Sequence, residues 1–349
     1  MAPLSVLDSH IHLWPEHMSN EQGHAWMTPG MPLAKEHILS QYYAASKQDG
    51  SSEQDFEVTG VVYVETDVRY DQPSGDVKDW AKGPLDEIKF LRDIVEAKYG
   101  ERDSKMLLAI VAWAPMDQST EVLEEWLRLA EETAGSETWR RVKGFRFLLQ
   151  AILDEEKFKT LVSSQHFINN LKLLGKRGFA FDVGVDQHSG GIWQLELISR
   201  AMTTAHVDVP DDEKVTFVLN HLCKPDFIPN GPDFDRWSKI IEHMSALPNT
   251  YMKLSGAFSE LPEGLSDTAS IATHVRPWVE HVFGSFGPSR VMFGSDWPVC
   301  NVRGPAGEDS WVVWKDVVTL LVDHNSLRLN DDHKASVWKG TAEKAYKIG

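Results

Sequence analysis

The chain has 349 residues, of which 42% are hydrophobic and 25% are charged, and its formal net charge at pH 7 is −17. The length suits one large α/β barrel or two medium domains. Because nucleic acids and anionic membrane surfaces are themselves negative, the acidic charge balance disfavours both as partners. No apolar run is long enough to span a membrane, and the two cysteines, Cys223 and Cys300, form no CxxC motif. We therefore expect a cytoplasmic protein with reduced thiols that pack rather than react.

Short β-rich runs recur along the chain, and amphipathic helical stretches separate them. The expected strands lie at about residues 5–11, 60–65, 106–113, 143–149, 179–185, 215–221, 251–255 and 291–295. Most are continuous Val, Ile, Leu and Phe runs, which is typical of parallel strands buried on both faces. Helices are expected at about 83–100, 119–135, 154–175, 191–206, 233–246, 268–284 and 310–323, with a terminal one at 330–347.

Eight strands that alternate with helical crossovers in a chain of this length predict a single (β/α)8 TIM barrel over residues 1–349. The prediction includes an extended first βα loop at about 13–35 and an extra C-terminal helix. A doubly wound open sheet is the alternative, but its usual Gly-rich phosphate turn does not follow the first strand. We expect the first loop to form a pocket wall, although a lid, a surface loop or a subunit contact would also fit. The polar segment 46–56 is expected to be a surface loop.

Polar residues gather where the predicted strands end, which is the edge of a TIM barrel that carries the active site. The first strand contains Asp8, His10 and His12 at intervals of two, a spacing that predicts three side chains on one face. The other strands contribute Glu65, Arg146, Asp182, Asn220, His221, Lys224, Lys253, Ser255 and Asp296, in chain order. Charged side chains are rarely buried unless they are paired or functional, so we expect the group as a whole to line a site.

Several of these residues also have a purely structural interpretation. Asp8 could hydrogen-bond neighbouring backbone, Glu65 could cap a helix on the outer face, and Asp182 could order a loop. The histidines in predicted loops and helices are expected to be surface residues; they are His24, His37, His243 and His333.

His10, His12 and Asp296 predict a shared centre, because barrel closure places the first and last strands side by side. Two imidazoles and one carboxylate suit a single divalent ion or a water-activating site. His-x-His by itself is a weak signal, but its combination with an Asp after the eighth strand is specific.

Six motifs along the chain resemble those of the amidohydrolase superfamily. They are LDSHIHLW, VKGFR, FDV, NHLCKP, YMKLSG and RVMFGSDWPV, which extend from residue 7 to about residue 300. Within the superfamily, the chain is most similar to the branch of sugar-acid lactonases, which includes L-rhamnono-γ-lactonases, L-fuconolactonases and 2-pyrone-4,6-dicarboxylate lactonases. The resemblance implies hydrolysis of a sugar-acid lactone, such as L-rhamnono-γ-lactone in L-rhamnose catabolism, to the open-chain aldonate.

The resemblance also implies roles for individual residues. Asp296 would deprotonate the attacking water and then protonate the leaving hydroxyl, while His10 and His12 would hold a metal or hydrogen-bond the lactone carbonyl. Arg146 would receive a carboxylate or ring oxygen, and His221 would border the reacting centre. The remaining substrate-binding candidates are Trp14, Glu65, Asp182, His188, Lys224, Lys253 and Trp297.

The chain departs from the binuclear members of the superfamily at two strands. Those members carry a carboxylated Lys or a Glu on the fourth strand and a His on the fifth, where this chain has Arg146 and Asp182. We therefore expect one divalent ion, with zinc favoured, held by His10, His12 and Asp296, or catalysis without a metal. Glu65 or His188 could add a further ligand.

The sequence leaves alternatives for the reaction, for whether the barrel is an active enzyme, and for the oligomeric state. A metal-dependent decarboxylase of the same superfamily is the alternative enzyme, and an inactive barrel that binds a sugar acid or a partner protein is the alternative from another class. Monomer and homodimer are both compatible with the sequence.

Overall fold

The computed structural model describes residues 3–50, 55–229, 231–262 and 264–349, so part of the expected surface loop at 46–56 lies outside the described residues. Eight parallel strands form one sheet in chain order. They are β1 (Leu4–Ile11), β2 (Phe56–Val64), β3 (Leu107–Trp113), β4 (Val142–Arg146), β5 (Ala180–Val183), β6 (Thr216–Leu219), β7 (Thr250–Leu254) and β8 (Val291–Phe293). The sheet closes where the backbone N–H of Asp296 donates to the carbonyl of His10 (2.9 Å) and that of His12 donates to the carbonyl of Trp297 (2.7 Å). The predicted (β/α)8 TIM barrel is confirmed.

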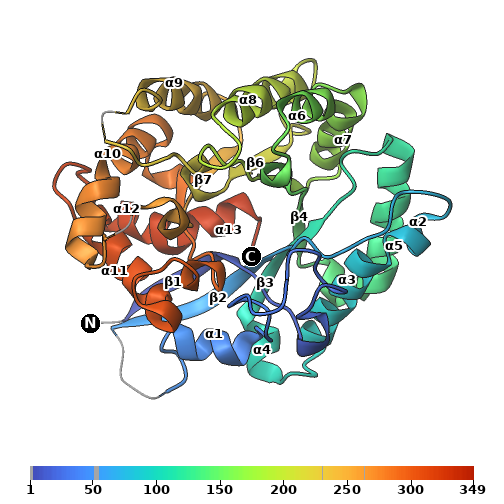
Figure 1. Cartoon of the computed structure of the whole chain (residues 1–349), viewed down its shortest axis with the longest axis horizontal. Helices are drawn as coiled ribbons and strands as arrows, with labels where there is room; N and C mark the ends of the chain where they lie inside the picture. The colour runs from blue at the N-terminus through green and yellow to red at the C-terminus, as the bar shows by residue number, and fades with distance from the viewer. Residues whose placement is uncertain (1–2, 51–54, 230, 263) are drawn as a thin grey trace.

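Helices form a ring around the strands (Figure 1). They are α1 (Leu39–Ala45), α2 (Val77–Trp80), α3 (Lys82–Val95), α4 (Glu101–Met106), α5 (Thr120–Trp139), α6 (Glu155–Val162), α7 (Gln165–Lys176), α8 (Trp193–His206), α9 (Phe234–Ser245), α10 (Thr268–Phe286), α11 (Ser310–Val322), α12 (Asp331–Ala335) and α13 (Thr341–Ala345). The helix expected at 154–175 is two helices, because Ser164 caps a new one by accepting a hydrogen bond from the N–H of Phe167. A π-helical turn, Ser336–Gly340, joins α12 to α13. Within the described ranges, no helix combines the length and apolarity needed to cross a bilayer.

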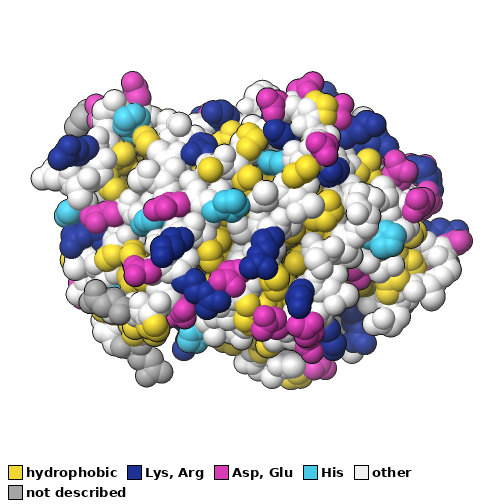
Figure 2. Space-filling view, turned by 90° about the horizontal axis from the view of Figure 1, so that it is seen from above, with side chains coloured by type: hydrophobic (Ala, Val, Ile, Leu, Met, Phe, Trp, Pro, Cys, Tyr) yellow, Lys and Arg dark blue, Asp and Glu magenta, His cyan; other side chains and the backbone are white. Residues whose placement is uncertain are grey.

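Acidic and basic side chains are interspersed on the face shown in Figure 2, where no block of one sign dominates. Many of them form surface ion pairs, such as Lys35 with Glu308 at 2.6 Å. On this face, the two signs of charge are therefore mixed rather than gathered in one field.

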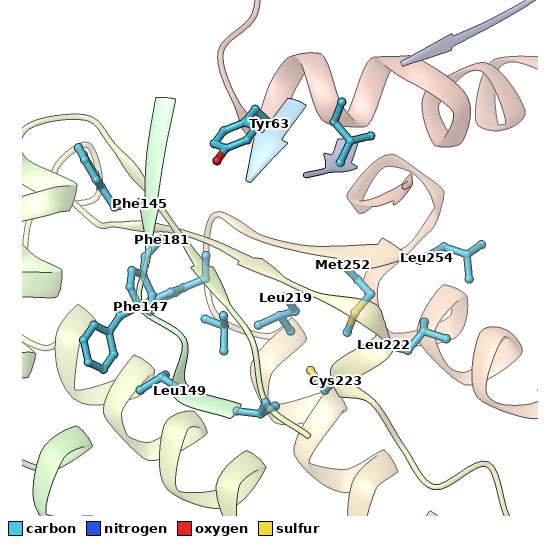
Figure 3. Packing of buried hydrophobic residues seen from close by; sticks show 14 of the residues in the cluster. Tyr63, Phe145, Phe147, Leu149, Phe181, Leu219, Leu222, Cys223, Met252 and Leu254 are labelled. Atoms are coloured by element: carbon cyan, nitrogen blue, oxygen red, sulfur yellow. The ribbon is translucent and has the colours of Figure 1, made fainter. Parts of the chain in front are cut away.

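The hydrophobic core has two layers that follow from the alternation of strand side chains. The outer layer lies between the strands and the helices, and Figure 3 shows Phe145, Phe181 and Met252 in this layer. The inner layer fills the barrel with Leu7, Val62, Val64, Ala109, Val111, Ala180, Val218, Tyr251 and Met292. Ala342, Ala345 and Tyr346, from the end of the chain, pack on this inner layer. The predicted C-terminal helix thus closes one end of the barrel.

Strand β1 does not alternate regularly, and this irregularity moves Asp8 to the outer face. The pairing register between β1 and β2 shifts between Asp8 and Ile11, so an extra residue separates inward-facing Leu7 from the next inward side chain. Asp8 consequently contacts the helical layer, where its Oδ2 accepts hydrogen bonds from the Tyr42 hydroxyl (3.0 Å) and the Trp311 indole (2.9 Å). The prediction that Asp8 shares a face with His10 and His12 is wrong for this reason.

Asp8 also ties β1 to the last strand, because its Oδ1 accepts from the N–H of Ser295 at 2.8 Å. We expect Asp8→Ala to lower the free energy of unfolding by about 3 kcal/mol, since several buried donors would lose a charged acceptor together. Urea unfolding followed by tryptophan fluorescence measures the change. Asp309→Ala is the matched control, because Asp309 is an exposed partner of Lys47 and its loss should cost less than about 1 kcal/mol. Equal midpoints for the two variants would contradict the assignment.

Candidate active site

Three imidazoles and one carboxylate converge at the carboxyl ends of β1, β6 and β8. The Oδ1 of Asp296 lies 3.6 Å from Nε2 of His10, 3.4 Å from Nε2 of His12 and 3.7 Å from Nε2 of His221. His10 and His12 also approach each other, with 3.2 Å between their Nε2 atoms. All four residues are buried. The expected convergence of first-strand imidazoles on the last-strand carboxylate is therefore present in the folded chain.

The backbone that carries this cluster is strained. His221, Leu222, Cys223 and Lys224 follow β6 with φ values of 56°, 54°, 59° and 42°, and Asp296 has φ of 63°. A left-handed conformation costs a non-glycine residue about 1–2 kcal/mol. The four-residue left-handed turn directs both His221 and Lys224 into the same cavity. Strain of this size at residues of one cluster is characteristic of functional sites.

Two of the imidazoles are oriented through their Nδ1 atoms. The Nδ1 of His12 lies 2.8 Å from the carbonyl of Val64, so it carries a proton and leaves a lone pair on Nε2, which faces Asp296. The Nδ1 of His221 lies 2.9 Å from the hydroxyl of Ser255. Each ring is thereby held with Nε2 toward the carboxylate.

The electrostatics of the cluster favour an ionised Asp296 and neutral imidazoles of His10 and His221 at neutral pH. Burial opposes charge on Asp296, but the neighbouring imidazoles and the ammonium group of Lys224 outweigh it and lower the pKa of Asp296 to about 2. Burial lowers the pKa of His221 to about 3, and burial together with Lys253 lowers that of His10. A carboxylate that stays charged in a buried cluster is suited to accept a proton from water.

A cavity of about 330 Å³ opens beside this cluster. Its walls are formed by His12, Trp14, Trp26, Leu33, Thr66, Asp67, Arg146, Leu148, Gln150, Ala151, His221, Lys224, Asp296 and Val299. A larger hollow of about 830 Å³ lies elsewhere, between α3 and the loops after β1 and β2. We assign the site to the smaller cavity because it is the one that contains Asp296 and two of the histidines.

The first βα loop forms the apolar wall of the cavity, as expected, through Trp14, Trp26 and Leu33. Polar contacts fix it to the loop after β2: the indole of Trp26 donates to the carbonyl of Thr66 (3.0 Å), and Nε2 of His24 lies 2.8 Å from the hydroxyl of Thr66. The wall is thus hydrogen-bonded in place.

His24 and His37 were expected on the surface, but both are buried. The loop folds back over itself, and burial lowers the pKa of each to about 4. Both are therefore neutral packing residues at physiological pH.

Arg146 lines the cavity, whereas its partner Glu65 does not. Glu65 is fully buried, and its Oε1 accepts a hydrogen bond from Nε of Arg146 at 2.5 Å. The Nη2 of Arg146 donates to the backbone carbonyl of Glu65, also at 2.5 Å. The structure differs here from the prediction that Glu65 binds substrate or caps a helix, because β2 and β4 lie close enough inside the ring for the two charges to pair. Glu65 instead holds the guanidinium group at the cavity.

Four other predicted substrate contacts lie outside the cavity lining. Asp182 and Lys253 are fully buried inside the barrel, where they pair with each other at 2.7 Å. His188 is exposed in the loop after β5. Trp297 packs against His37 and Tyr42 rather than facing the cavity. Lys224 does line the cavity, between Glu260 (3.1 Å) and Asp186 (3.6 Å).

The structure adds cavity residues that the sequence analysis did not single out. Asp67 is the most notable, because burial and the charge of Glu65 raise its pKa to about 6. It is the third residue after β2, so the strand-end rule could have found it. Gln150 is the fourth residue after β4, and its Oε1 is buried without a hydrogen-bond partner within the described chain.

The cluster fits one divalent ion. One ligand atom from each of His10, His12 and Asp296 lies within 4.8 Å of the others, and four-coordinate zinc with bonds of about 2 Å places its ligand atoms about 3.3 Å apart. Neither Glu65, which is paired with Arg146, nor exposed His188 belongs to this group. The donor set of two imidazoles and one carboxylate is one that zinc accepts.

Comparison with known proteins agrees with this architecture. Residues 7–348 match the Amidohydrolase family. The chain is 32% identical to L-rhamnono-gamma-lactonase of Scheffersomyces stipitis, over the whole of both chains, and 27% identical to L-fucono-1,5-lactonase of Burkholderia multivorans, over 77% of this chain and 79% of that one. The fold is similar to that of a zinc-bound amidohydrolase from Burkholderia multivorans, with a TM-score of 0.71, 24% identity and 99% of each chain covered. The chain belongs to the amidohydrolase family and is a hydrolase of that family.

Proposed function

We propose that the protein is a lactonase that hydrolyses the ring ester of a sugar-acid lactone, with L-rhamnono-γ-lactone or a close relative as substrate. The observation that carries the proposal is the ionised Asp296 beside three imidazoles, at a cavity that also contains the cations Arg146 and Lys224. The activity named for the relative that is 32% identical over the full chain supports the same substrate class.

In the proposed reaction, the Asp296 carboxylate accepts a proton from water as the water oxygen attacks the lactone carbonyl carbon. Negative charge develops on the carbonyl oxygen, and Arg146 and Lys224 are the cations in the cavity that stabilise it. The ring C–O bond then breaks, and Asp296 returns the proton to the departing oxygen, which becomes a hydroxyl group of the aldonate. A divalent ion held by His10, His12 and Asp296 would supply Lewis-acid polarisation of the carbonyl.

The lining of the cavity suits a deoxy sugar acid. Trp14, Trp26 and Leu33 offer an apolar wall for a methyl group, and Arg146, Lys224 and Gln150 offer polar contacts for ring hydroxyls and oxygens. L-Rhamnono- and L-fucono-lactones carry both kinds of substituent.

A panel of lactones tests the proposal. The purified protein is assayed by acid release, with a pH indicator, on L-rhamnono-γ-lactone, L-fucono-1,5-lactone, 2-pyrone-4,6-dicarboxylate and unsubstituted γ-butyrolactone. We expect the highest kcat/KM for one of the deoxy sugar lactones. Elemental analysis, together with activity after chelation, shows whether an ion is present and required. Carbon dioxide release from a carboxylated substrate, without hydrolysis of any lactone, would instead favour a decarboxylase.

The pH profile provides a separate test. A base with a lowered pKa is active when deprotonated, so activity is lost as the pH falls through that pKa. With Asp296 at about 2 and His221 at about 3, we expect kcat/KM to be flat from about pH 5 to 8 and to fall only below about pH 4. Chromatographic measurement of the aldonate avoids an indicator over this range. An inflection near pH 6 would contradict the expectation and would implicate Asp67.

A further inference from the structure

A chain of hydrogen bonds connects the C-terminal end of the protein to His10. The hydroxyl of Tyr346 donates to the carboxylate of Asp182, with 2.9 Å to each oxygen. The Nζ of Lys253 lies 2.7 Å from Oδ2 of Asp182 and 3.1 Å from Nδ1 of His10. All four side chains are buried in the barrel interior.

The fold explains how residues so far apart in sequence meet. Asp182 lies two residues after Ala180 and Lys253 lies two residues after Tyr251, so strand alternation turns both polar side chains toward the barrel axis. Tyr346 follows α13, which packs on the same inner layer. The C-terminus lies near the centre of the ring in Figure 1. Tyr346, near the end of the chain, therefore contacts Asp182, which is part of the row of hydrogen bonds that ends on His10.

We propose that Tyr346 is a positioning residue for the reaction, and that it holds the His10 imidazole in place through Asp182 and Lys253. This inference rests on the proposed lactonase function. The ion pair with Asp182 fixes Nζ of Lys253 at 3.1 Å from Nδ1 of His10, and this contact holds the ring with Nε2 at 3.6 Å from Oδ1 of Asp296. Outer partners of this kind set the orientation of active-site imidazoles, and their removal costs about 10–100-fold in activity or metal affinity.

A purely structural role explains this group less well. Burying an ion pair is often no better for stability than apolar residues of the same volume, because both charges must leave water. Apolar side chains such as Ala180, Val218 and Met292 pack in the inner layer next to the pair, and Arg146 lies beside Asp182 on the neighbouring strand. A chain of polar contacts that crosses this layer and ends on a cluster imidazole is accounted for by its action on that imidazole.

Tyr346→Phe removes one hydroxyl and keeps the ring, and Tyr251→Phe is the matched control. Tyr251 belongs to the same inner layer and its ring contacts Lys344 of α13, but it has no place in the chain of contacts to His10. We expect Tyr346→Phe to lower kcat about 10-fold with KM changed less than twofold, and Tyr251→Phe to leave both unchanged. Asp182→Asn, which breaks the next contact, should lower kcat at least as much.

Two further measurements separate positioning from stability. In protein labelled with ¹⁵N-histidine, Tyr346→Phe should shift the His10 imidazole resonances, which are assigned by their loss in His10→Gln, while Tyr251→Phe should not. Metal content is measured in each variant, so that a change in loading is not mistaken for a change in turnover. A wild type without lactonase activity would defeat the proposed function. An active wild type with unchanged kcat and unshifted His10 resonances in Tyr346→Phe would defeat only this inference.

Discussion

Asp296→Asn is expected to lower kcat for lactone hydrolysis by about 1,000-fold, the largest loss we anticipate from one substitution. The amide keeps the shape of the side chain but cannot accept the proton of the attacking water. Its NH₂ group would also present a donor where Oδ1 now lies 3.4 Å from Nε2 of His12. Initial rates on the best substrate of the lactone panel measure the loss.

The control for this substitution is Asp323→Asn, since Asp323 is exposed and pairs with Lys334 on the surface. It should retain full activity. Circular dichroism and thermal unfolding establish that both variants fold. A folded Asp296→Asn protein that turns over at a rate close to wild type would show that another group is the base.

Gly256→Ala is expected to lower kcat about 100-fold, although residue 256 lies outside the cavity lining. A Cβ atom at this position would lie 2.3 Å from Nδ1 of His221, where the hydroxyl of Ser255 now makes its contact. The imidazole has to move, and a displacement of about 1 Å at a reacting group costs on the order of 100-fold in rate. Steady-state kinetics on the same lactone measure the effect.

Backbone strain would accompany this substitution, because Gly256 has φ of 60°. Gly75→Ala controls for that effect: Gly75 has φ of 68°, but a Cβ atom there would meet nothing within 4 Å. Both variants should lose about 1–2 kcal/mol of stability, and only Gly256→Ala should lose activity. Similar activity in the two variants would mean that the contact with His221 is unimportant.

The barrel and the members of its site could be predicted because both depend on local patterns. Buried strands read as apolar runs, and the active-site edge of a parallel barrel is the one where these runs end in polar residues. His12, Arg146, His221, Lys224 and Asp296 line the cavity as the strand-end rule predicts. The family resemblance assigned roles to these residues that periodicity alone cannot give.

The errors at Asp8, Glu65 and Asp182 have a common physical origin in how the strands pair in three dimensions. Asp8 turns outward because of a register shift in β1, which no spacing rule reveals. Glu65 and Asp182 were expected to meet substrate, but each lies opposite a cation from another strand, Arg146 and Lys253 respectively. Such partners come from residues 81 and 71 positions away, so only the closed ring determines them.

The left-handed turn at 221–224 bears on any attempt to make this protein more heat-resistant. Glycine adopts positive φ without steric cost, but Leu222 and Cys223 are fully buried, so glycine at either position would relieve about 1–2 kcal/mol of backbone strain and leave a core cavity that costs more. The same change would free the segment that carries His221 and Lys224, and looser support of reacting groups lowers turnover. Selection for survival after heating would therefore keep Leu222 and Cys223, because their burial in the core holds the strained segment in its active conformation.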